Sequence, residues 1–129
     1  MFLYTLYATI YKEKIEKEEM FMEHMEGLEI ISFQIINYVG TARDKYLEAI
    51  AAAKKGNFEK ADSLLKEGEQ QFVKGHKAHT ELIQKDVANG SVVMNLLLTH
   101  AQDQLMSAEA FKIIATEFID VYKRISPNV

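Results

Sequence analysis

Apolar residues recur at helical spacing along most of the chain, and the first long run of them predicts an amphipathic helix. Between about residues 18 and 55, apolar positions three or four apart share one face: Leu28, Ile31, Ile35, Val39, Ala42, Tyr46 and Ile50. Such a face packs against a core. Gly40 lies in the middle of this helix, where glycine costs about 1 kcal/mol relative to alanine. We therefore expect another helix to approach closely at Gly40.

A short break ends this helix, and a second helix follows it. Gly56 suits the left-handed conformation that often terminates a helix, and Asn57 can cap the helix that comes next. The apolar pattern then predicts a second helix from about Phe58 to Val87, with its charged side chains on the opposite face.

The second break lies at Asn89-Gly90-Ser91, where Ser91 is expected to cap a third helix. That helix runs from Val92 to about Ile125, and Ser126-Pro127 ends it. No strand-like alternation competes with this pattern. Three long helices with short connections predict an all-α fold, an antiparallel three-helix up-down-up bundle. The third helix is apolar around much of its circumference, which predicts burial against other subunits.

The first 24 residues depart from this regular pattern. Residues 1–11 are apolar and aromatic, whereas residues 12–19 are almost entirely charged. A secretory signal would place its positive charges first and a small-residue cleavage site after the apolar run. We treat 1–24 as an N-terminal extension of uncertain order, frayed or helical, before a three-helix domain at 25–129. A membrane- or partner-docking arm is the second interpretation of this extension.

Composition removes several classes of function. The chain has 129 residues, enough for one domain, and a formal net charge of -4 without a basic stripe, which argues against nucleic-acid binding. It has no cysteine, so disulfides and thiolate metal sites are excluded, and this composition fits a reducing compartment. No apolar run approaches the roughly 20 residues that a membrane-spanning helix needs.

The candidate chemistry centres on His100 and Asp103 in the third helix. These residues are three apart and therefore share one helical face. Leu96, Ala110 and Ile114 extend the same face, so we expect a buried stripe. A carboxylate on a buried stripe is costly unless it has a partner or a cation.

A second group of histidines lies on the second helix. His76 and His79 are also three apart, and Thr80 follows them. Because the second and third helices are antiparallel, pairing about the turn near Gly90 brings residues 76–80 level with about 100–104. We therefore expect the two histidine groups to face each other, within about one helical turn.

Three interpretations of these residues are open. They satisfy a polar spot in a core, they bind a metal through His76, His79, His100 and Asp103, or a histidine carries a phosphoryl group. The metal interpretation lacks the paired Glu-x-x-His motifs of di-iron bundles. A mid-helix histidine receives no help from the free backbone N–H groups of a helix start, so His76, His79 and Thr80 would supply donors. The residues alone leave the last two interpretations level.

Four sequence motifs carry a family resemblance. The run His100-Ala101-Gln102-Asp103-Gln104-Leu105-Met106 resembles the H-[AG]-Q-D-[HQ]-L-M signature of lactose/cellobiose-type IIA proteins of the phosphoenolpyruvate-dependent sugar phosphotransferase system (PTS). Gly40-Thr41-Ala42-Arg43 resembles that family's G-x-A-R. Gly56-Asn57-Phe58 with Ala61 resembles its G-[DN]-F-x-x-A turn, and His76 with Thr80 resembles its A-H-x-x-Q-T segment. The motifs occur in the family's order within about residues 27–124.

The resemblance implies an assembly and roles for individual residues. The fold would be a trimer of three-helix protomers, a nine-helix bundle. His100 would be the phosphohistidine, and Asp103 would meet its two symmetry mates around one divalent metal ion per trimer, usually assigned as Mg²⁺. His76 and Thr80 would lie beside the phosphohistidine, and Gln102 belongs to the motif without an assigned role. His79 stands where the family usually has glutamine and Gln104 often corresponds to histidine, so the donors around the phosphate are redistributed.

The function that this resemblance implies is that of a cytoplasmic phosphocarrier. His100 would accept a phosphoryl group from the phosphohistidine of HPr and pass it to a cysteine of the cognate IIB protein. The pathway would import a disaccharide of the lactose, cellobiose or chitobiose class, with peripheral association to the membrane component IIC. Sugar contact belongs to that component, so the sequence does not identify the disaccharide. The alternative is a trimeric helical bundle that binds a metal or a partner without phosphoryl transfer.

Overall fold

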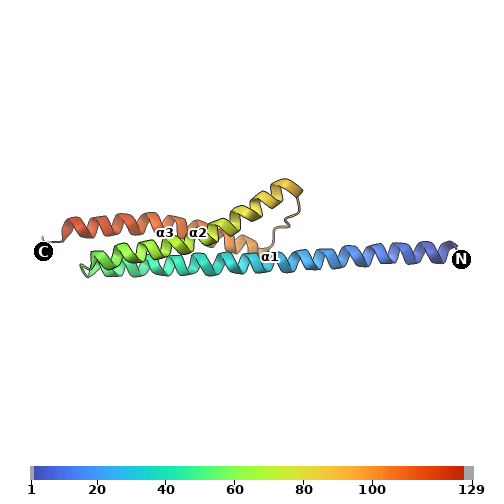
Figure 1. Cartoon of the computed structure of the whole chain (residues 1–129), viewed down its shortest axis with the longest axis horizontal. Helices are drawn as coiled ribbons and strands as arrows, with labels where there is room; N and C mark the ends of the chain where they lie inside the picture. Colours follow the sequence, from blue (N-terminus) through green and yellow to red (C-terminus); the bar gives the residue numbers. More distant parts are fainter. Residues whose placement is uncertain (1, 127–129) are drawn as a thin grey trace.

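The computed structural model describes residues 2–126, without the side chains of residues 2, 4, 24 and 25. Three helices follow one another as α1 (Phe2–Lys54), α2 (Phe58–Asn89) and α3 (Leu96–Ile125). Within the described residues there is no strand. Figure 1 shows α2 returning along α1 and α3 running back beside both. The predicted all-α fold with three long antiparallel helices is confirmed.

The core forms where both shorter helices pack against α1. Its largest fully buried side chain is Tyr46, and the cluster around it draws on all three helices: Ile35, Val39, Ala42, Phe72, Ala101, Leu105, Ala108 and Ala115. Burial, together with the Glu69 carboxylate, raises the pKa of Tyr46 to about 12. Small residues of α3 at the contact let its backbone come close to α1.

Close helix approach occurs at two glycines of α2, and the expectation for Gly40 is wrong within the chain. A Cβ atom built on Gly40 would meet nothing within 4 Å. A Cβ on Gly68 would lie 2.5 Å from Cε1 of Tyr46, and one on Gly75 would lie 2.7 Å from Cγ1 of Val39. The glycines that permit contact therefore lie on the helix that packs against α1.

The first break matches its prediction, and the second does not. Gly56 has a φ of 80°, and the Asn57 side chain accepts a hydrogen bond from the Lys60 backbone N–H at 3.2 Å. At the second break α3 begins at Leu96 rather than Val92, and Asn95 rather than Ser91 is the cap, accepting from the Leu98 N–H at 2.8 Å. The Asp86 carboxylate holds the Val92 N–H at 3.1 Å, which keeps this segment outside the helix.

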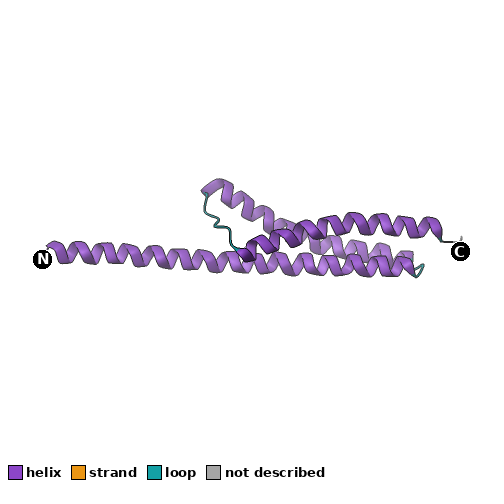
Figure 2. Cartoon of the chain, turned by 180° about the vertical axis from the view of Figure 1, so that it is seen from behind, coloured by secondary structure: helices purple, strands orange, loops and turns teal. Residues whose placement is uncertain are grey.

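The N-terminal extension is helical and continuous with α1. Figures 1 and 2 show this end of α1 projecting past the α2–α3 connection, with no other helix beside it. The charged stretch carries ion pairs one turn apart, Lys12–Glu16 at 3.9 Å and Lys14–Glu18 at 4.0 Å, which support an exposed helix. None of the helices between residues 2 and 126 is long and apolar enough to cross a membrane.

Candidate functional site

His100 and Asp103 lie on the exposed face of α3, so the expected buried stripe is wrong for the single chain. Leu96 is 87% exposed and Ile114 46%. The residues of α3 that are buried belong to another face: Leu98, Ala101, Leu105, Ala108, Ala115 and Ile119. The exposed face nevertheless carries large apolar side chains: Leu96, Met106, Ile113, Ile114, Phe118, Val121 and Ile125. We call these seven residues, together with Asp103, the outer face of α3.

The late start of α3 changes the surroundings of His100. His100 is the fifth residue of the helix and lies in its second turn, not in mid-helix as expected. Side chains of a helix tilt toward its N-terminus, so the imidazole of His100 leans toward the first turn. Backbone N–H groups of a first turn lack intrahelical acceptors and carry partial positive charge. A negatively charged group bound to His100 is therefore favoured at this position.

One flank of α3 connects to α1 through a polar contact. The guanidinium Nη1 of Arg43 donates a hydrogen bond to Oε1 of Gln104 at 3.2 Å. Gln104 lies one turn after His100, and residues four apart occupy the same side of a helix. The Arg43 guanidinium, half-buried on α1, is thus held on the side of α3 that carries His100.

The other flank of α3 connects to α2. The amide Nε2 of Gln102 lies 3.1 Å from the ring Nε2 of His79. Because an amide nitrogen can only donate, this contact suits a neutral His79 whose proton is on Nδ1. Burial lowers the pKa of His79, and the charge of His76 lowers it further, which agrees with this neutral form. This contact confirms the prediction that residues 76–80 of α2 lie beside residues 100–104 of α3.

We predict that His76→Ala raises the pKa of His79 toward its ordinary value without reaching it. The substitution removes the charge of His76 but leaves burial, the larger cause, in place. Because folding lowers this pKa, the unfolded chain binds more protons, and the folded state loses stability as the pH falls below about 6.5. Titration of the ring resonances by NMR measures the shift. An unchanged or lower pKa in His76→Ala would contradict the electrostatic part of this account.

The remaining candidates do not gather around His100 within one chain. His76 is exposed and its ring lies tilted against that of Phe72 of its own helix, with ring centroids 5.9 Å apart, while Thr80 is half-buried on α2. Nowhere between residues 2 and 126 do three or more His, Asp or Glu side chains come together as metal ligands. Within the described residues, a single chain therefore does not bring together His76, His79, His100 and Asp103, the four side chains of the metal interpretation.

Arg43 is the residue of this site to which sequence reasoning gave no role. It was visible only as the last residue of the motif Gly40-Thr41-Ala42-Arg43, on a helix that contains many other charged side chains. Its hydrogen bond to Gln104, 61 residues away in sequence, is what connects it to the His100 side of α3. In the sequence, the motif and not the charge distinguishes Arg43 from the other charged residues of this helix.

Comparison with known proteins gives one consistent result. The model of the family described as "PTS system, Lactose/Cellobiose specific IIA subunit" matches residues 30–123. The chain is 43% identical over 101 residues to the lichenan-specific phosphotransferase enzyme IIA component of Bacillus subtilis strain 168, covering 78% of this chain and 92% of that protein. It is 34% identical over 99 residues to the lactose-specific EIIA component of the PTS in Staphylococcus aureus, covering 77% and 96%.

Solved structures agree with the sequence comparison. The PTS cellobiose-specific enzyme IIA from Bacillus anthracis superposes with a TM-score of 0.74 at 39% identity, covering 76% of this chain and 90% of that one. The IIA(chitobiose) protein of Escherichia coli, solved in complex with HPr, gives a TM-score of 0.68 at 28% identity, covering 76% and 95%.

Proposed function

The chain belongs to the family of lactose/cellobiose-specific IIA subunits of the sugar phosphotransferase system, and on that premise we propose that it is a phosphocarrier in which His100 bears the phosphoryl group. The exposure of His100 at the start of α3 carries the proposal. A nucleophile that meets two partner proteins in turn must be reachable from solvent. The solved complex of the similar E. coli protein with HPr supports HPr as the donor.

The proposed transfer conserves one phosphoryl group through two substitutions. A ring nitrogen of neutral His100 attacks the phosphorus held on the phosphohistidine of HPr, forming one N–P bond as the other breaks. A cysteine thiolate of the cognate IIB protein then attacks the same phosphorus, and His100 leaves as neutral imidazole. Both steps depend on in-line positioning and on stabilisation of charge at the phosphoryl oxygens.

Two features of the chain suit it to hold the phosphorylated state. The first turn of α3 presents the positive end of the helix to the group on His100. Arg43, anchored by Gln104 on the same side, adds a guanidinium that can bind phosphoryl oxygens. Within one chain, His76, His79 and Thr80 lie on the α2 side of α3 and do not gather around His100. We therefore propose that, in the assembled protein, they line the phosphorylation site of a neighbouring chain.

We propose that the outer face of α3 is covered in a homotrimer. A contiguous apolar face of this kind is unusual on a monomeric protein. Asp103 sits within it, so three copies around a three-fold axis would bring three carboxylates together. Carboxylate oxygens suit a hard divalent cation such as Mg²⁺, which would neutralise their repulsion. Asp103 is the one residue of each chain that would hold this ion.

Replacing Asp103 by leucine is expected to keep the trimer and to make it independent of divalent cations. Removing a buried charge cluster in favour of apolar packing is neutral or stabilising by about 1–4 kcal/mol. Light scattering gives the mass, and thermal unfolding with and without a chelator gives the metal dependence, which only the unmodified chain should show. A monomeric Asp103→Leu protein, or equal chelator sensitivity in both proteins, would refute the role given to Asp103.

The proposed function is tested by incubating the protein with phosphoenolpyruvate, enzyme I and HPr, and then measuring intact mass. We expect one added phosphoryl group that is stable at neutral pH and lost in acid, as N–P bonds are. Adding the cognate IIB protein should then move the group to a cysteine of IIB. Failure to acquire the group from native partners would favour the alternative, a bundle that binds a metal or a partner without phosphoryl transfer.

A further inference from the structure

The core-facing stripe of α1 does not stop where the three-helix bundle stops. Leu28, Ile35 and Ala42, seven apart, are buried in the bundle. The same seven-residue series runs back to Phe21, Lys14 and Tyr7, and the interleaved series runs back from Ile31 through His24 to Lys17, Ile10 and Leu3. The six positions between Leu3 and Phe21 form a heptad seam of the kind found in coiled coils, which we call the N-terminal seam.

Within residues 2–126, no other helix covers this seam. Its apolar members are largely exposed: Leu3 77%, Tyr7 70%, Ile10 58% and Phe21 53%. Figures 1 and 2 show the helix projecting alone beyond the α2–α3 connection. The extension also precedes residue 30, where the match to the family begins. The three-helix fold therefore gives no reason for its apolar pattern.

The two lysines at the middle of the seam decide what can pair with it. In a parallel pairing of identical helices each seam residue meets its own copy, so Lys14 would face Lys14 and Lys17 would face Lys17. An antiparallel pairing centred level with Lys12 avoids both repulsions. Lys14 then packs against Ile10 of the other copy, and Lys17 lies over the ring of Tyr7, where the ammonium and the aromatic face attract.

We propose that the N-terminal seam is a docking surface for a second copy of this chain, joined as an antiparallel two-helix coiled coil. The pairing is two-fold symmetric and therefore closes on itself. It does not rest on the proposed function: a monomeric domain would become a dimer, and two trimers would become one closed hexamer. In either case the mass doubles.

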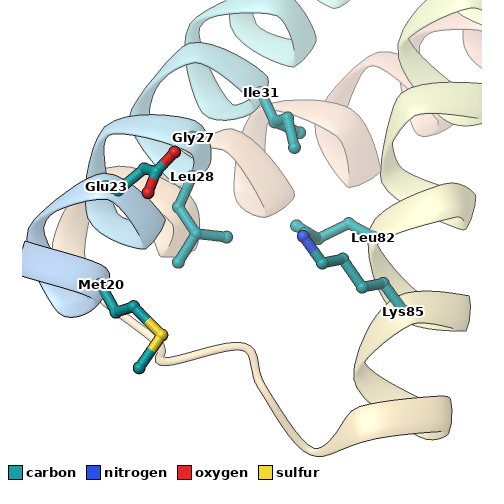
Figure 3. Close-up of a pocket in the computed structure, with 7 residues that line it drawn as sticks. All are labelled: Met20, Glu23, Gly27, Leu28, Ile31, Leu82 and Lys85. Carbon is teal, nitrogen blue, oxygen red and sulfur yellow. The ribbon is translucent and has the colours of Figure 1, made fainter. Parts of the chain in front are cut away.

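A cavity at the base of the extension lies at the end of this pairing. It has a volume of about 320 Å³ between α1 and the end of α2. Figure 3 shows Leu28 and Glu23 of α1 on one side of it and Leu82 and Lys85 of α2 on the other. In the antiparallel register Leu3 of the second copy lies level with Phe21, next to the cavity residue Met20. The amino end of each helix thus reaches this cavity in the other copy.

A lipid surface fits the same segment less well. Helices that bind anionic membranes pair an apolar face with an excess of Lys and Arg. Residues 12–19 contain three lysines and four glutamates, so their net charge is negative. The apolar face is also interrupted by Lys14 and Lys17, which suits a pairing with register better than a bilayer.

The first test compares the mass of the full chain with that of two matched variants. Ile10 lies in the seam, whereas Ile15, 38% exposed, lies on another side of the same helix. We expect Ile10→Glu to halve the mass measured by light scattering and Ile15→Glu to leave it unchanged. Equal masses for the unmodified chain and Ile10→Glu would overturn the proposal. It would also be overturned if the unmodified chain, but not Ile10→Glu, floated with vesicles of phosphatidylcholine and phosphatidylglycerol.

The second test reads the register directly. Because the chain contains no cysteine, single-cysteine variants carry one reactive site. A short bismaleimide crosslinker should join Leu3→Cys to Phe21→Cys when the two are mixed, and should join neither variant to itself. Self-linking of each variant alone would show parallel pairing and overturn the proposed arrangement. Phosphoryl transfer to Ile10→Glu should match the unmodified chain, so failure of this inference is distinguishable from failure of the proposed function.

Discussion

Replacing His100 by alanine is expected to abolish phosphorylation while leaving the three-helix fold intact. The side chain is exposed, so its removal leaves no cavity and no unpaired buried group. Without the ring nitrogen there is no nucleophile to form the N–P bond, and the rate should fall by about 10³-fold or more. Intact mass after incubation with phosphoenolpyruvate, enzyme I and HPr measures the loss, and circular dichroism measures the fold.

The adjacent Thr99 provides the control for this experiment. Its hydroxyl donates to the Asn95 carbonyl at 2.9 Å in the same turn of α3, and its side chain is exposed. Thr99→Ala should still acquire one acid-labile phosphoryl group. An acid-labile group on His100→Ala would mean that another residue is the nucleophile.

Replacing Gly68 by alanine is expected to be the most destabilising single-methyl change in α2. The new Cβ atom would lie 2.5 Å and 2.8 Å from two ring carbons of Tyr46 and 3.2 Å from the Ala42 carbonyl oxygen. Tyr46 is fully buried, so its ring cannot turn into solvent to make room. Overpacking of this kind costs about 1–3 kcal/mol even after the gain in helix propensity, or a decrease in Tm of roughly 4–12 °C.

Gly27→Ala is the matched control for Gly68→Ala. Gly27 also lies inside a helix, but a Cβ atom there would meet nothing within 4 Å. Alanine should stabilise the chain by up to about 1 kcal/mol through helix propensity alone. Thermal unfolding at equal protein concentration compares the two variants. Equal, small effects at both positions would show that Tyr46 can move and that the Gly68 contact is not needed.

Local features of the fold were predictable because short-range physics governs them. The apolar period identified three long helices, and Gly56-Asn57 identified both the end of α1 and the cap of α2. The position of His79 beside Gln102 was predictable because α2 and α3 are antiparallel and joined by a short connection. The family was also recognisable, because its motifs lie within short stretches of sequence.

The start of α3 and the exposure of its site depended on contacts that no local pattern reveals. Ser91 and Asn95 are both good caps, and the choice between them was made by the Asp86 side chain holding the Val92 N–H. The sequence pattern predicts that the stripe of α3 with His100 and Asp103 is buried. In the structure α1 packs instead against another face of α3, where alanines allow closer approach.

The sequence by itself determined the helices, their order and the residues capable of phosphoryl chemistry, because periodicity, capping and reactive side chains are properties of neighbouring residues. Only the tertiary structure decided that Arg43 connects to Gln104 and that His79 lies beside Gln102 with a lowered pKa. The same holds for Gly68 and Gly75 as the points of close approach. Those features arise from distances between separate helices, which depend on how all side chains of the core pack together.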